Sequence, residues 1–145
     1  MHRPLVLLCA TLALAACATP RAGTQAARSC YHRNAQVETE IGYCEAVRHG
    51  DTLHVSGSVG QGDMPAAIRM AYDSVGKTLA ANGYTFADVV SEHVYATDLD
   101  AFIRNKDVRK TFYGDTLPSA TWVQVQRLYR PAFVVEVEVT AEHAH

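Results

Sequence analysis

Two short runs of alternating apolar and polar residues open the folded part of the chain, at residues 43–49 and 52–58. Gly50-Asp51 lies between them, and a Gly-Asp pair between two such runs favours a hairpin turn. The pattern therefore predicts two antiparallel strands. The glycines at positions 57, 60 and 62 then predict a flexible loop.

A helical spacing of apolar residues follows that loop. Asp63 can cap the helix, and Pro65 fits its first turn. Asn82-Gly83 predicts an end in left-handed geometry. The apolar residues expected on one face of this helix are Ile68, Ala71, Tyr72, Val75 and Leu79.

Residues 71–78 of the same segment (AYDSVGKT) match a permissive phosphate-loop expression. A true phosphate loop follows a strand and needs a backbone free to turn its N–H groups toward phosphate. Here the match lies in the middle of a predicted helix, with Tyr72 and Val75 on its apolar face. We therefore reject a nucleotide site at this position.

The rest of the chain alternates strand and helix patterns. Asp98 or Asp100 begins a second helix, which Gly114 and Pro118 end. Strands are expected at residues 88–97, 122–128 and 133–140, from β-branched content or period-two alternation. The order β-β-α-β-α-β-β predicts an α+β fold in which two helices cover one sheet.

Composition narrows the function classes. The chain has 145 residues, 48% of them hydrophobic, which suits one domain with a real core. The formal net charge is −2, and this excludes a broad basic face for nucleic acid.

The first residues have the layout of a bacterial secretory signal. Arg3 precedes an apolar run that is too short to span a membrane. Leu14-Ala15-Ala16-Cys17 resembles a lipoprotein cleavage motif, which predicts a signal peptide at 1–16 and a lipidated Cys17. Ordinary secretion or a misread start are the alternatives. Residues 17–40 are expected to form a tether. An aspartate after the lipidated cysteine would retain a lipoprotein at the inner membrane, and Ala18 at this position therefore favours the outer membrane. The prediction is a periplasmic lipoprotein that meets the membrane only through its lipid.

Cys9 would leave with the signal peptide and Cys17 would carry the lipid, so two cysteines would remain unmodified. Cys30 and Cys44 can form one disulfide in an oxidising periplasm, or Cys44 can be a free thiol and even a nucleophile. The spacing of cysteines and histidines predicts no metal site. Glu136 and Glu138 share one face of the last strand, about 7 Å apart. Such a pair suits acid/base chemistry, or is simply a solvated strand face.

Several short motifs, taken in order, resemble the RidA (YjgF) family. The resemblance covers residues 41–141, leaving residues 142–145 as a tail. The matching segments are Gly42–Val47 (G-P-Y-S-Q-A-V in the family, here without the proline), Gly50–Gly57 (G-D…V-S-G), Asp88–Asn105, Leu117–Thr121 (around P-A-R-[S/T]), Val125–Leu128 (V-x-R-L) and Val135–Glu138 (V-E-I-E).

This resemblance implies a chorismate-mutase-like subunit in a barrel-forming homotrimer, with ligand clefts between neighbouring subunits. Active members hydrolyse enamines and imines made by pyridoxal-phosphate enzymes, and no cofactor or metal of their own is expected. A family arginine grips the substrate carboxylate in a bidentate pair. By position, Glu136 matches the water-positioning glutamate, Tyr43 the aromatic residue of the cleft, and Ser56 and Asn105 pocket-side residues.

The chain departs from the family pattern at the arginine, whose position holds Ala120. Glu45 likewise replaces a glutamine and adds negative charge. As an alternative, Arg127 or Arg130 could swing into the cleft in its place, but Arg127 matches a family arginine outside the carboxylate contact, and a surface or interface ion pair is the better interpretation of it. We therefore expect a small-molecule-binding trimer that is not a standard 2-iminoacid deaminase. The alternative is a deaminase-type hydrolase that uses Glu136 on a less anionic substrate.

Overall fold

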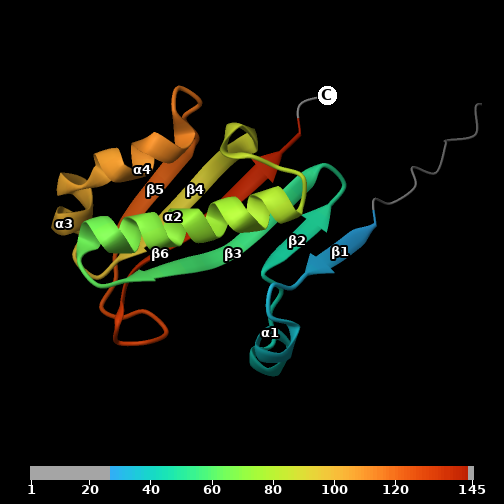
Figure 1. The fold of residues 1–145 in the computed structure, drawn as a ribbon, viewed down its shortest axis with the longest axis horizontal. Helices are drawn as coiled ribbons and strands as arrows, with labels where there is room; N and C mark the ends of the chain where they lie inside the picture. Colours follow the sequence, from blue (N-terminus) through green and yellow to red (C-terminus); the bar gives the residue numbers. More distant parts are fainter. Residues whose placement is uncertain (1–26, 144–145) are drawn as a thin grey trace, which may run out of the picture.

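The structure, a computed structural model, describes residues 27–143. This part of the chain forms a six-stranded sheet with helices packed on one face (Figure 1). The strand order is β1-β2-β3-β6-β4-β5, and neighbours are antiparallel except for the parallel pair β4–β5. The strands are β1 (Arg28–Tyr31), β2 (Ala46–His49), β3 (Thr52–Gln61), β4 (Val89–Ala96), β5 (Ser119–Gln124) and β6 (Phe133–Glu142).

The helices are α1 (Ala35–Ile41), α2 (Met64–Ala81), α3 (Leu99–Arg104) and α4 (Lys106–Tyr113), with a short 3₁₀ turn at Phe86–Asp88. Helix α2 runs across the sheet, and α3 and α4 lie at the end near β5, while α1 projects on its own (Figure 1). The predicted order β-β-α-β-α-β-β is confirmed over residues 46–142, with the second helix broken into α3 and α4 at Asn105.

The residues that end α2 and α3 are among those that the sequence predicts. The Asp63 carboxylate accepts the Ala66 N–H at 2.9 Å, and Gly83 has φ +83° after α2. Asp98, rather than Asp100, caps α3 by accepting the Ala101 N–H at 2.8 Å. These caps satisfy donors that a helix terminus leaves without partners.

The predicted loop at 57–62 is wrong for most of its length, because β3 continues to Gln61. Pairing with β6 holds this segment extended, with an irregularity between Val55 and Ser58. Gly60 is needed for packing: a Cβ there would lie 1.9 Å from the Ala67 carbonyl oxygen of α2. The glycine therefore allows α2 to approach the sheet closely.

The predicted tether is also wrong for its last part, since β1 and α1 occupy residues 28–41. A disulfide joins Cys30 to Cys44, and Arg33 forms an ion pair with Glu45. Tertiary contacts thus hold two elements that are too short to show a clear periodicity. The predicted signal peptide, Cys17 and the first part of the tether lie outside the described residues.

The predicted tail begins too early. Glu142 belongs to β6, and the His143 ring stacks on Tyr84 with centroids 3.9 Å apart.

The strand predicted at 122–128 is shifted as well. It starts at Ser119 because its parallel pairing with β4 begins there, at Ser91.

A buried carboxylate lies within the core between the sheet and the helices. Glu92 on β4 is fully buried. The four groups that donate to its oxygens are Arg109 Nε at 2.5 Å, Tyr113 OH at 2.7 Å, Tyr72 OH at 2.9 Å and Trp122 Nε1 at 3.0 Å. Because each of α2, α4, β4 and β5 contributes a member, this network fixes the helices on the sheet.

Candidate functional site

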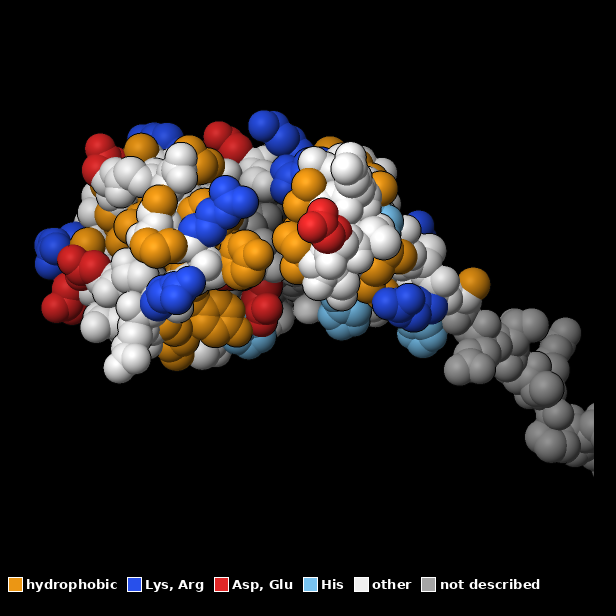
Figure 2. Space-filling view, turned by 90° about the horizontal axis from the view of Figure 1, so that it is seen from below, with side chains coloured by type: hydrophobic (Ala, Val, Ile, Leu, Met, Phe, Trp, Pro, Cys, Tyr) orange, Lys and Arg blue, Asp and Glu red, His pale blue; other side chains and the backbone are white. Residues whose placement is uncertain are grey.

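A cavity of about 510 Å³ lies against β3 and β6. Helix α1 and the loop between β5 and β6 form its other walls. Figure 2 views the molecule from the side on which these two segments project, and the surface is hollowed between two lobes there. The cavity is lined by Val37, Ile41, Tyr43, Ser56, Gly57, Val59, Tyr129, Arg130, Phe133 and Glu136.

Glu136 is the carboxylate of this cavity. It pairs with Val59 of β3, and it lies half-buried on the sheet face opposite the buried Val135 and Val137. Burial, helped by repulsion from Glu138, raises the pKa of Glu136 above its usual range. Among the described residues no side chain donates a hydrogen bond to it. The carboxylate is therefore available to a ligand or to water.

Gly57 explains how the carboxylate reaches this position. A Cβ on Gly57 would lie 1.8 Å from Glu136 Oε1. Only glycine leaves room for the carboxylate against the backbone of β3. The pairing irregularity between Val55 and Ser58 falls at the same point, and such bulges often lie beside functional sites.

Tyr43 and Ser56 flank Glu136 in the cavity lining. The Ser56 hydroxyl donates to the Cys44 carbonyl oxygen at 2.7 Å, which ties β3 to the segment before β2. Burial, together with the charges of Glu45 and Glu38, raises the pKa of Tyr43. The Tyr43 hydroxyl therefore stays protonated and can donate a hydrogen bond. The structure thus brings together three of the predicted site residues, Tyr43, Ser56 and Glu136.

Asn105 and Ala120 do not line this cavity. Asn105 lies at the junction of α3 and α4, where its amide donates to the Ala101 carbonyl oxygen at 2.8 Å. Ala120 lies on the edge strand β5, in register with Glu92 of β4. Glu92 and Tyr95 are three residues apart on β4, and Tyr95 pairs with Glu136. Ala120 and Glu136 therefore belong to opposite faces of the sheet.

Arg130 is the cation among the residues that line the cavity. Its guanidinium carbon lies 5.9 Å from the centroid of the Phe133 ring, and the side chain is exposed. Arg130 comes from the loop between β5 and β6, so neither strand nor helix periodicity could assign it to the site.

Val37 and Ile41 of α1 are a further part of the lining that the sequence reasoning missed. Both side chains are about half exposed in the single chain, at 45% and 51%. A signal for α1 was present, because Asn34 caps it by accepting the Val37 N–H at 3.3 Å and Gly42 ends it with φ +96°. These two residues turn the helix into an apolar wall.

The cysteine alternatives are resolved by a disulfide between Cys30 and Cys44, with Cα atoms 5.6 Å apart. Cys44 is therefore not a free nucleophile in this form. The bond anchors β1 and, through it, α1 beside the cavity.

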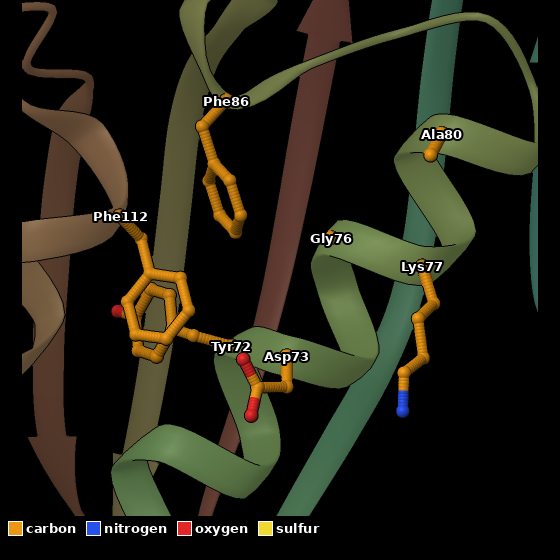
Figure 3. Close-up of a pocket in the computed structure, with 7 residues that line it drawn as sticks. All are labelled: Tyr72, Asp73, Gly76, Lys77, Ala80, Phe86 and Phe112. Carbon is orange, nitrogen blue, oxygen red and sulfur yellow. The ribbon is translucent and has the colours of Figure 1, made fainter.

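A second hollow, of about 440 Å³, lies between α2, α4 and the turn at Phe86 (Figure 3). The Phe86 ring points toward α2 at Gly76, and Asp73 and Lys77 lie on the same helix beside Gly76 (Figure 3). This is the segment that matches the phosphate-loop expression. It is helical throughout, so its N–H groups bond within the helix and the rejection of a phosphate loop is confirmed.

Comparison with known proteins identifies the family. Residues 33–143 match the family model described as Endoribonuclease L-PSP. The chain is 31% identical to the RutC family protein YjgH of Escherichia coli over 106 residues, 68% of this chain and 81% of that protein. It is 30% identical to the 2-iminobutanoate/2-iminopropanoate deaminase of Mus musculus over 108 residues, 68% of this chain and 79% of that enzyme.

The fold comparison agrees. A crystal structure of a member of the YjgF/YER057c/UK114 family from Mycobacterium tuberculosis superposes with a TM-score of 0.75 at 31% identity, covering 81% of this chain and 100% of that one. The chain belongs to the RidA (YjgF) family. Within residues 27–143, no helix has the length and apolar character needed to cross a membrane.

Proposed function

We propose that this chain binds a small organic molecule at the Glu136 cavity and does not carry out the standard hydrolysis of 2-imino acids. The observation that carries the proposal is that Glu136, Tyr43 and Ser56 line one cavity. It is supported by Ala120, which stands where the resemblance to the family places the arginine for the substrate carboxylate. An alanine side chain has no donor. A carboxylate bound beside it would lose a charge-assisted contact worth about 1.5–3 kcal/mol.

The full site takes shape between two subunits of a homotrimer. One subunit contributes the Glu136 cavity, and its neighbour contributes the β5 edge with Asn105 and Ala120. This arrangement explains why these groups lie on different faces within one chain. The neighbouring subunit would also cover the apolar side chains of α1, Val37 and Ile41, which are exposed in the single chain.

The chemistry of the cavity favours an uncharged or cationic ligand. Its walls are largely apolar, and its carboxylate is available. Arg130 is exposed, so water screens its charge and holds the side chain less firmly than a buried bidentate pair would. The ligand therefore places its apolar part against Val37 and Phe133 and its polar part toward Glu136.

A second candidate function, hydrolysis of an imine or enamine of low negative charge, is favoured by the state of Glu136. A half-buried carboxylate with a raised pKa, and with no hydrogen-bond donor from residues 27–143, suits a general base. It would take a proton from water as the oxygen bonds to the imine carbon. The resulting carbinolamine then loses ammonia to leave a carbonyl product, so that imine and water give ketone and ammonia.

Ammonia release from imines tests both functions. 2-Iminobutanoate would be generated in situ by a pyridoxal-phosphate enzyme, and an uncharged imine would be supplied in parallel. The unmodified chain is expected to leave the background decay of 2-iminobutanoate unchanged, and Ala120→Arg is expected to accelerate it. Fast turnover of 2-iminobutanoate by the unmodified chain would overturn the proposal.

Turnover of the uncharged imine alone would support the second function. In that case Glu136→Gln should abolish it, while Glu138→Gln, which changes the neighbouring carboxylate on the same strand, should retain most of it. Equal loss in both variants would remove Glu136 from the role of base.

We also propose that the chain is a lipoprotein held at the periplasmic side of the outer membrane through Cys17. The motif Leu14-Ala15-Ala16-Cys17 after the apolar run supports this. Mass spectrometry of the protein from membranes should find an acylated Cys17 at the N-terminus, and Cys17→Ser should release the protein from the membrane. An unmodified N-terminus before residue 17 would contradict it.

A further inference from the structure

Three potential metal ligands lie together at the base of α1. The sulfur atoms of Cys30 and Cys44 and a ring nitrogen of His32 are all within 4.8 Å of one another. His32 Nε2 lies 3.0 Å from Cys30 Sγ. In the form described here the two sulfurs are joined to each other, so the cluster is closed to metal.

The other nitrogen of His32 is held by a buried carboxylate. His32 Nδ1 lies 2.7 Å from Glu38 Oε2, and Glu38 is 2% exposed. The Asn34 N–H and the Arg33 N–H donate to the other oxygen of this carboxylate, Oε1, at 2.7 Å and 3.1 Å, and these bonds fix the position of Glu38. A carboxylate oxygen accepts hydrogen bonds, so the tautomer of His32 that fits this contact carries its hydrogen on Nδ1.

This arrangement leaves the lone pair of Nε2 directed at the sulfurs. A carboxylate that holds one ring nitrogen while the other faces a ligand cluster is the usual support of a metal-binding histidine. The orientation of His32 is thus already fixed for coordination, without any movement of α1.

From this geometry we infer that reduction of the Cys30–Cys44 disulfide opens a zinc site formed by Cys30, Cys44 and His32. A reductant of the phosphine class supplies the electron pair: the phosphine attacks one sulfur, the S–S bond breaks, and water delivers the oxygen that leaves with the phosphine oxide. Two thiols result. Zinc binding then releases both thiol protons and leaves two thiolates and one imidazole on the metal.

The donor set selects the metal. Two thiolates and one imidazole suit Zn²⁺, and a fourth position remains for water. Cα atoms 5.6 Å apart allow both sulfurs to turn toward one ion once the S–S bond is open. Cys30 is exposed, so a reductant can reach it.

Cobalt titration of the full chain tests the inference. The chain is reduced with an excess of a phosphine, which is removed without oxygen before Co²⁺ is added. The reduced chain should bind one Co²⁺ with sulfur-to-cobalt charge-transfer absorption and intense visible bands of four-coordinate cobalt. Zn²⁺ should displace the cobalt and bleach these bands. The oxidised chain should show neither signal.

Variants separate this cluster from the other thiols of the chain. Cys30→Ser/Cys44→Ser keeps Cys9 and Cys17 and should lose the signal completely. His32→Ala should weaken Zn²⁺ binding at least tenfold, and Glu38→Gln about 10–100-fold. His49→Ala, an exposed histidine on β2, should bind as the unmodified chain does.

The circular dichroism of each oxidised variant shows whether its fold is intact. Cobalt absorption that survives Cys30→Ser/Cys44→Ser would overturn the site. Equal binding by His32→Ala and His49→Ala would overturn the role of His32. Absence of charge-transfer absorption in the reduced unmodified chain would overturn the inference as a whole.

Discussion

The ion pair between Glu92 and Arg109 gives the most quantitative prediction of stability. Glu92 is 0% exposed, Arg109 is 7% exposed, and Arg109 Nε donates to Glu92 Oε1 at 2.5 Å. Arg109→Ala removes the cation and leaves the carboxylate buried, with only neutral donors. Breaking a buried pair in this way costs about 3–5 kcal/mol. A domain of this size is stable by about 5–15 kcal/mol in total, so the loss is a large fraction.

Urea unfolding followed by circular dichroism measures this cost at fixed protein concentration. Lys110→Ala, on the exposed side of α4, is the matched control and should lie within about 0.5 kcal/mol of the unmodified chain. The double variant Glu92→Gln/Arg109→Met removes both charges. It should be more stable than Arg109→Ala by about 1–2 kcal/mol, because no charge is left uncompensated.

Two outcomes would refute this reasoning. If Arg109→Ala unfolds within about 1 kcal/mol of the unmodified chain, the pair does not hold α4 on the sheet. If the double variant is less stable than the single one, the energy resides in the hydrogen bonds that the Glu92 carboxylate accepts from its neutral donors Tyr72, Tyr113 and Trp122, and the charge of Arg109 is not decisive.

Three further predictions follow from the site and the fold. Gly57→Ala should displace the Glu136 carboxylate and weaken ligand binding at least tenfold, with little loss of stability. Gly60→Ala, whose Cβ meets the backbone of α2, should instead lower the free energy of unfolding in urea by about 1–3 kcal/mol. The reverse pattern would contradict both assignments. Because the folded-state pKa of Glu136 is raised above 4.5, stability should fall as pH rises from that value through the raised pKa, and Glu136→Gln should remove this fall; parallel pH profiles of the two proteins in thermal melts would contradict it. Light scattering on the chain lacking residues 1–17 should give the mass of a trimer, and a monomer would remove the proposed cleft between subunits.

The sequence predicts the central elements because each carries its own local signal. Asp63 caps α2, Gly50-Asp51 turns the β2–β3 hairpin, and the alternation in β6 places Val135 inward and Glu136 outward. Such signals depend on neighbouring residues alone, so they survive without knowledge of the tertiary structure.

The parts that the sequence does not predict depend on distant contacts. Alternation on β4 puts Glu92 in phase with the buried Val94, but its partners come from α2, α4 and β5. Helix α1 is short and is held by the bond to Cys44. Arg130 reaches the cavity from a loop whose course no periodicity describes.

The structure brings together some of the residues predicted for the site. Tyr43, Ser56 and Glu136 meet because β3, β6 and the segment before β2 are neighbours in the sheet. Asn105 and Ala120 lie apart from them within one chain, and the proposed homotrimer would bring the two groups together.

Binding of a 2-keto acid tests the central claim most directly, because such a product carries the carboxylate and does not react. Calorimetry would compare 2-ketobutyrate binding to the unmodified chain, Ala120→Arg and Arg130→Ala. The account predicts weak or undetectable binding by the unmodified chain and binding by Ala120→Arg that is about 10–150-fold tighter, equivalent to about 1.5–3 kcal/mol. Tight binding by the unmodified chain that disappears in Arg130→Ala would contradict it, since a second guanidinium would then hold the acid group.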